Sequence, residues 1–131
     1  MGIGICYDLR FPELAMLMRQ RGANFLIYPG SFNLTTGPLH WELLIRARSL
    51  DSQCYVCAVS AAQYKDDPSI YQAWAHSTLV DPFGRVLVGL DENPNIAFYD
   101  VDPNYTTEVR EQIPIYDQKR HDIYKLEDKN I

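Results

Sequence analysis

The chain of 131 residues is long enough for one domain and too short for two of ordinary size. Hydrophobic residues make up 47% and charged residues 22%, the balance of a globular domain rather than of a disordered segment. The net charge of −5 argues against general nucleic-acid binding, which needs a basic surface. No apolar run approaches the roughly 20 residues that span a bilayer, and no secretory signal is recognisable. We therefore expect neither a nucleic-acid nor a membrane partner.

The hydrophobic pattern alternates between short strands and helices. It predicts strands over residues 2–6, 24–29 and 54–62, a hairpin over 76–90 that turns at 81–84, a strand over 96–102, and helices over 12–22, 39–53 and 103–112. Pro12 in the first turn and Gly22 after the last turn are typical of a helix between them. Residues 113–131 form a polar tail, which by itself suggests a frayed terminus.

The helix over 39–53 shows an apolar stripe. Its members are Leu43, Ala47 and Leu50, and we expect them to face the core. Arg46 and Arg48 fall outside this stripe, where they are expected to form ion pairs.

This order of elements defines the fold class. Strands that alternate with helices and then continue as a hairpin predict an α/β protein with a partly parallel sheet. The first strand begins at residue 2, without an earlier strand to pair with. We therefore expect the chain to start in the middle of a domain.

The chain has three cysteines, Cys6, Cys54 and Cys57, an odd count that favours free thiols in a reducing compartment. Cys54 and Cys57 have C-x-x-C spacing, but they lie inside an apolar strand. A redox pair needs its first thiol at an exposed helix start, so we interpret these two as core residues. No second pair of ligands has the spacing of a zinc site.

Cys6 stands where the first strand ends and ahead of a helix. Ligands of α/β sheets bind beyond the carboxyl ends of the strands, and a helix start there would favour a thiolate. The amide of Tyr7 could then point at a developing oxyanion. By spacing alone, an ordinary packed thiol remains the alternative.

Several stretches resemble the nitrilase superfamily, the carbon–nitrogen hydrolases. They are "GIGICYDLRFPEL" at 2–14, "YPGSFNLTTGPLHWELLIRARSLDSQCYV" at 28–56, "AHSTLVDPFGRVL" at 75–87 and "EQIPIYDQKRHDIY" at 111–124. The later stretches are most similar to the omega-amidase branch. The resemblance covers essentially the whole chain.

The resemblance implies an α-β-β-α sandwich, usually a homodimer, with a Glu–Lys–Cys triad. Cys6 occupies the position of the nucleophile, and the Tyr7 amide that of an oxyanion donor. The family's Glu and Lys precede the cysteine, and neither Glu13 nor Glu42 matches the Glu. Residues 1–131 are therefore interpreted as the C-terminal half of such a domain, with 113–131 as its tail. In the family this tail packs against the body or the partner subunit, which makes Tyr116 and Tyr124 candidate anchors.

Three further residues have two interpretations each. Arg10 either binds a substrate carboxylate, as arginines after the nucleophile do in some relatives, or pairs with Asp8. Phe32 either lines the pocket or packs its own loop. His76 aligns with a position that supports the site without contacting substrate, and direct acid–base work there is not expected.

The implied reaction is hydrolysis of a small linear carboxamide, such as α-ketoglutaramate, to acid and ammonia through a cysteine thioester, without metal or organic cofactor. We expect this chain alone to be inactive. Three alternatives stay open: a truncated form that acts only with a full-length subunit, a gene-model fragment, and a redox-responsive thiol protein that uses Cys6. The cytosol is the default compartment, and mitochondria remain an alternative.

Overall fold

All of the predicted strands except the one over 96–102 pair into one sheet. The computed structural model describes residues 1–129. Its five strands stand side by side in chain order: β1 (Gly2–Ile3), β2 (Phe25–Pro29), β3 (Tyr55–Val59), β4 (Thr78–Val80) and β5 (Val86–Gly89). β1, β2 and β3 run parallel, whereas β4 and β5 are antiparallel to their neighbours. The partly parallel sheet predicted from the sequence is confirmed.

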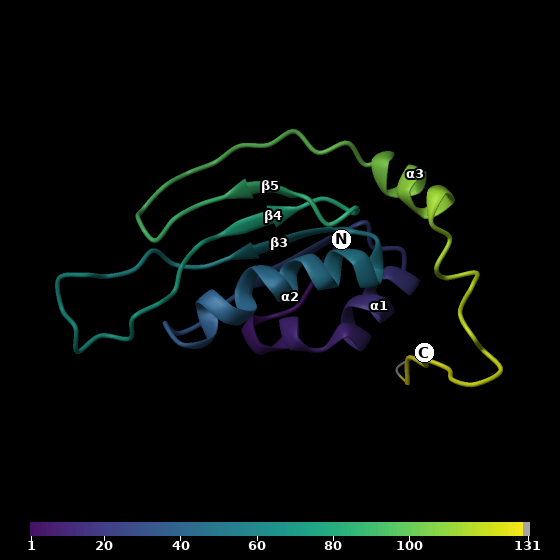
Figure 1. Cartoon of the computed structure of the whole chain (residues 1–131), viewed down its shortest axis with the longest axis horizontal. Helices are drawn as coiled ribbons and strands as arrows, with labels where there is room; N and C mark the ends of the chain where they lie inside the picture. The colour runs from purple at the N-terminus through teal and green to yellow at the C-terminus, as the bar shows by residue number, and fades with distance from the viewer. Residues whose placement is uncertain (130–131) are drawn as a thin grey trace.

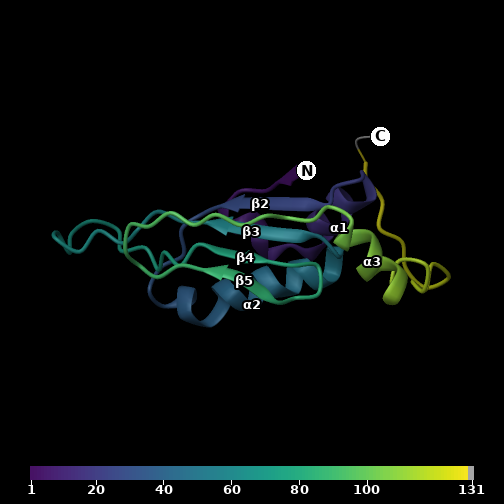
Figure 2. The same cartoon turned by 90° about the horizontal axis from the view of Figure 1, so that it is seen from above.

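Two helices lie on one face of this sheet (Figure 1). α1 (Pro12–Gln20) connects β1 to β2, and α2 (Thr36–Ser52) connects β2 to β3. Both are crossover helices, which parallel strands require. A short 3₁₀ helix, η1 (Cys6–Arg10), precedes α1, and α3 (Tyr105–Gln112) lies beyond the end of the sheet (Figure 2).

The buried face of α2 differs from the predicted one. Leu43 is 66% and Leu50 is 52% exposed, so the expectation that they face the core was wrong. The residues that α2 buries are Gly37, Trp41, Ile45, Arg48, Ser49 and Ser52. Polar side chains are tolerated there because they are bonded: the Ser52 hydroxyl donates to the Arg48 carbonyl at 2.6 Å.

The other face of the sheet carries no helix. Residues 91–104 run along this face as an extended segment opposite α1 and α2 (Figures 1 and 2). The strand predicted over 96–102 is absent, because this backbone pairs with no strand of the described chain. Ile96 is 78% and Phe98 is 91% exposed. Ile96 and Phe98 therefore point into solvent, whereas Ala97, Tyr99 and Val101 line a cavity against the sheet.

The tail begins at the end of α3 and passes the C-terminal end of α1. Tyr116 packs there, with its hydroxyl 3.5 Å from the Met16 carbonyl. Tyr124 remains exposed, so only the first of the two candidate anchors packs on the body. None of the helices in residues 1–129 is long and apolar enough to cross a membrane.

Candidate active site

Cys6 is the first residue of η1 and has an unusual backbone. Its φ is +48°, in the left-handed region that residues other than glycine seldom adopt. The turn is held by Asp8, whose carboxylate accepts the Ile5 N–H at 2.8 Å while its own N–H donates to the Ile5 carbonyl at 3.0 Å. Strained backbone of this kind is concentrated at functional sites.

The end of β2 approaches this turn closely. A Cβ on Gly30 would lie 2.7 Å from the Cα of Cys6, a separation that real Cβ atoms do not show. Because Gly30 has no side chain, the backbone that follows β2 can pack directly against the Cys6 turn. The Cys6 thiol lies 4.0 Å from the Ser31 carbonyl and is partly exposed, so it is not enclosed in the core.

A short 3₁₀ helix separates Cys6 from α1. The helix predicted from Pro12 does begin there, and the five-residue η1 lies between it and the thiol. The helix start that was expected to favour a thiolate therefore does not directly follow Cys6. The first hydrogen bond of η1 is donated by the Asp8 N–H to the Ile5 carbonyl. The Tyr7 N–H comes before this bond, so it is left over by the helix and is a candidate donor.

Arg48 fixes the other end of η1, a role that the sequence did not suggest. Its side chain is 5% exposed, and its Nε donates to the Leu9 carbonyl at 2.8 Å. It also forms an ion pair with Asp51 in the same helix. The contact joins residues 39 positions apart, so no local pattern could have shown it.

Arg10, the last residue of η1, lies over two aromatic rings. Its guanidinium carbon is 4.7 Å from the centre of the Phe32 ring and 5.1 Å from that of Tyr7. Its Nη1 lies 3.2 Å from Nδ1 of His40. Asp8 bonds to backbone instead, and Arg10 forms no ion pair within residues 1–129. This cation is thus positioned without a neutralising carboxylate.

Phe32 is part of the core. It is 5% exposed and meets Trp41 edge-to-face at 5.0 Å between ring centres. Its contact with the candidate site is therefore through Arg10, which it supports by a cation–π interaction.

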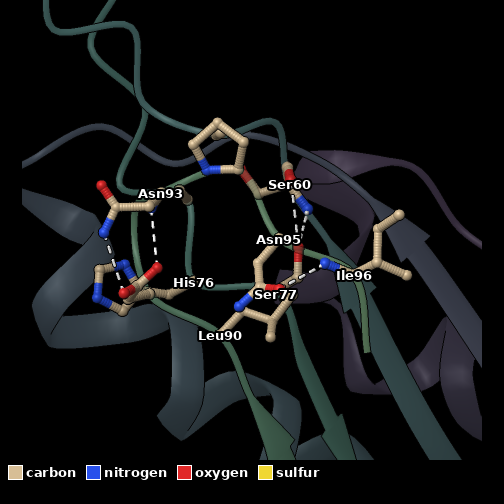
Figure 3. Close-up of a pocket in the computed structure, with 11 residues that line it drawn as sticks. Ser60, His76, Ser77, Leu90, Asn93, Asn95 and Ile96 are labelled. Atoms are coloured by element: carbon tan, nitrogen blue, oxygen red, sulfur yellow. Dashed lines mark hydrogen bonds between the residues drawn. The ribbon is translucent and has the colours of Figure 1, made fainter. Parts of the chain in front are cut away.

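His76 lies at the start of β4, beside a separate cavity. Its φ is +59°, its ring stacks on Trp74 at 4.0 Å, and its carbonyl accepts the Trp41 indole N–H at 2.7 Å. With Ser60, Ser77, Asn93 and Asn95 it lines a cavity of about 370 Å³ (Figure 3). Cys6 is not among the lining residues.

The described chain brings neither a Glu nor a Lys into hydrogen-bond contact with the Cys6 thiol. Glu42 pairs with Arg46 on the surface of α2, and Lys65 pairs with Glu92. Within residues 1–129, no three His, Cys, Asp or Glu side chains are grouped to hold a metal ion.

The other two cysteines are packing residues, as predicted. Both are free thiols, Cys54 fully buried and Cys57 partly so. Burial raises the pKa of each thiol, which disfavours the reactive thiolate.

Comparison with known proteins places these features in a family. The family model described as "Carbon-nitrogen hydrolase" matches residues 1–111. The chain is 55% identical over 126 residues to nitrilase homolog 2 of Dictyostelium discoideum, which covers 96% of this chain and 38% of that protein. It is 54% identical over 128 residues to omega-amidase NIT2 of Mus musculus, covering 98% and 46%.

Solved structures agree with the sequences. The NitFhit protein of C. elegans superimposes with a TM-score of 0.89 at 42% identity, covering 95% of this chain and 30% of that chain. Nit3 of Saccharomyces cerevisiae, described as a member of branch 10 of the nitrilase superfamily, gives 0.83 at 44%, covering 90% and 43%.

The chain belongs to the carbon–nitrogen hydrolase family, and the α/β fold predicted for it is confirmed. It spans less than half the length of the curated relatives it matches. Its assignment to the C-terminal half of the domain stays a prediction.

Proposed function

We propose that this chain carries the nucleophile of an omega-amidase-like hydrolase that converts small linear carboxamides to acid and ammonia. The observation that supports this most strongly is the left-handed Cys6 at the end of β1, held by Asp8 and Gly30. The 54% identity to a protein named omega-amidase supports the choice of substrate class.

The reaction would begin with attack of the Cys6 thiolate on the amide carbon. The carbonyl oxygen becomes an oxyanion, for which the free Tyr7 N–H is the candidate donor. The carbon–nitrogen bond then breaks, the nitrogen takes up a proton, and ammonia leaves a thioester on Cys6. Water hydrolyses the thioester to the acid and restores the thiol.

Arg10 is proposed to select substrates with a second, charged end. Its guanidinium has no carboxylate partner in the described chain and lies over the rings of Phe32 and of Tyr7, the residue that follows Cys6. A carboxylate could form two parallel hydrogen bonds with it. An ω-amide with a carboxylate at its other end, such as α-ketoglutaramate, would satisfy both Cys6 and Arg10.

The general base and the ammonium that assists the oxyanion are proposed to come from polypeptide outside this chain. Without a general base the rate falls by about 10²–10⁴-fold, and without an oxyanion donor by about 10²–10³-fold. We therefore propose that the chain alone has no measurable turnover.

The exposed apolar surfaces support a larger assembly. Phe98 projects from the helix-free side of the sheet, while Leu39 and Leu43 lie exposed on α2. We propose that the helix-free side is covered by the remainder of the domain and α2 by a second copy.

Complementation tests this function. The chain is co-expressed with the part of mouse omega-amidase NIT2 that it does not match, and ammonia release from α-ketoglutaramate is measured. We expect release from the pair, none from either part alone, and none from a pair carrying Cys6→Ala. Cys57→Ala is the matched control and should remain active. Release that survives Cys6→Ala, or turnover by the chain alone, would contradict the proposal.

A non-catalytic partner of a full-length relative is the second candidate. It predicts that the chain binds a full-length relative and changes its activity, but that Cys6→Ala has no effect on this change. The complementation assay with both variants separates the two candidates.

A further inference from the structure

One residue of α2 makes a hydrogen bond with the side chain of Arg10. Nδ1 of His40 lies 3.2 Å from Nη1 of Arg10, although the two residues are 30 positions apart in the chain. A guanidinium can only donate hydrogen bonds, so Nδ1 is the acceptor. The His40 ring is therefore neutral in this contact and carries its proton on Nε2.

The same helix also holds the backbone of Arg10. Nη2 of Arg48 lies 3.5 Å from the Arg10 carbonyl, and Nε of Arg48 donates to the preceding carbonyl, that of Leu9, at 2.8 Å. Arg48 therefore fixes the backbone from which the Arg10 side chain extends, while His40 contacts the far end of that side chain. Both ends of Arg10 are thus positioned by α2.

The hydrogen bond to His40 supplies a direction that the aromatic rings do not. The guanidinium carbon of Arg10 lies 4.7 Å from the centre of the Phe32 ring and 5.1 Å from that of Tyr7. A cation–π contact places a charge near a ring but has no single donor–acceptor line. Within residues 1–129, the bond to His40 is the only hydrogen bond of the Arg10 guanidinium. His40 is therefore the contact that sets the rotation of this group.

This orientation decides which donors of Arg10 stay available. Nε is shut off from solvent and has no acceptor in the described chain. Nη2 makes no hydrogen bond in residues 1–129, and it is not shut off from solvent. Nη1 has two N–H groups, of which His40 takes one. The donors left for a ligand are therefore on the two terminal nitrogens.

We propose that His40 is a positioning residue for substrate recognition: its Nδ1 orients the Arg10 guanidinium so that the terminal nitrogens meet the carboxylate of an ω-amide. The inference rests on the proposed function, in which Arg10 binds that carboxylate. In this arrangement His40 contacts Arg10 and not the substrate. Loss of His40 should therefore weaken the binding of carboxylate-bearing amides and leave the chemistry at Cys6 unchanged.

The test is steady-state kinetics of His40 variants in the complemented enzyme. In His40→Leu we expect KM for α-ketoglutaramate to rise by about three- to tenfold with kcat unchanged, because Arg10 must then be ordered when the substrate binds. For an uncharged amide such as butyramide, kcat and KM should stay within about twofold, which also shows that the variant folds. His40→Asn keeps an acceptor close to the position of Nδ1, so it should restore most of the affinity. Glu42→Gln is the control on the same helix, because Glu42 is exposed, and it should match the wild type with both substrates.

A double variant separates positioning from a general structural effect. If His40 acts through Arg10, then Arg10→Gln combined with His40→Leu should have the same KM as Arg10→Gln alone, because no guanidinium remains to be oriented. This inference alone would be overturned by multiplied effects in the double variant, by equal changes for the two amides, by an unchanged KM in His40→Leu, or by His40→Asn being no better than His40→Leu. A wild-type pair that releases no ammonia would overturn the proposed hydrolysis, and this inference with it.

Discussion

Replacing Arg48 by methionine should loosen the turn that presents Cys6. The methionine keeps much of the apolar stem but removes the donor to the Leu9 carbonyl at 2.8 Å. Loss of a buried hydrogen bond from a charged group costs about 1.5–3 kcal/mol. The half-exposed pair with Asp51 adds about 0–1 kcal/mol. We therefore expect the free energy of unfolding to fall by about 2–4 kcal/mol.

Urea unfolding measures this loss. With a slope of about 2 kcal/mol per molar urea, the midpoint should fall by about 1–2 M. Glu42→Gln is the control on the same helix, because Glu42 is exposed and its ion pair with Arg46 is long, at 3.7 Å. Its midpoint should fall by less than about 0.5 M.

The same variant should change the site. Release of the Leu9 carbonyl frees the end of η1, so Cys6 should react faster with iodoacetamide in Arg48→Met than in Glu42→Gln. If both variants unfold at the same urea concentration and Cys6 reacts at an unchanged rate, Arg48 does not hold the turn and the reasoning is refuted.

Three further predictions concern the same region. Gly30→Ala places a Cβ 2.7 Å from the Cα of Cys6, so we expect a loss of about 1–3 kcal/mol in urea unfolding and an altered alkylation rate at Cys6; wild-type values for both would show that the close approach is not needed. Burial raises the pKa of the Tyr28 hydroxyl to about 12 from an ordinary value of 10.0, and within residues 1–129 the hydroxyl makes no hydrogen bond. Because the folded state holds this proton more tightly, the stability that the Tyr28 proton contributes is complete below pH 10 and is lost as the pH rises from 10 to 12. Tyr28→Phe should therefore reduce the fall of the unfolding free energy over this pH range. An unchanged slope of unfolding free energy against pH would contradict this prediction. In the complemented enzyme, Arg10→Gln should raise KM for α-ketoglutaramate by at least about tenfold and leave KM for an uncharged amide unchanged. Equal effects on the two KM values would show that Arg10 does not bind the substrate carboxylate.

Most of the fold was predictable because its signals are local. The strand over 24–29 and the first helix carry their own apolar periods and end signals, and both were placed within a few residues. The hairpin follows from its turn, where the Gly84 N–H donates to the Asp81 carbonyl at 3.0 Å.

The errors came from contacts between distant segments. The buried face of α2 includes Arg48 and two serines, whose burial depends on acceptors elsewhere in the chain. The apolar period of Leu43 and Leu50 could not show this. The segment over 96–102 has a strand-like sequence, but a strand also needs a neighbour, and the described chain supplies none.

The candidate site was predictable only in part. The sequence located Cys6, Tyr7 and Arg10, since they follow one another after a strand. It missed Arg48 and the 3₁₀ turn that lies between the thiol and α1. The left-handed backbone of Cys6 depends on how β2 and η1 meet at Gly30, which is a property of the packed structure.

Acid-quenched mass spectrometry of the complemented enzyme tests the role of Cys6 most directly. During turnover of α-ketoglutaramate, the account predicts an acyl group on the peptide that contains Cys6, removable by hydroxylamine. Ammonia release with that peptide unmodified throughout, or with the acyl group on Cys54 or Cys57 instead, would contradict it.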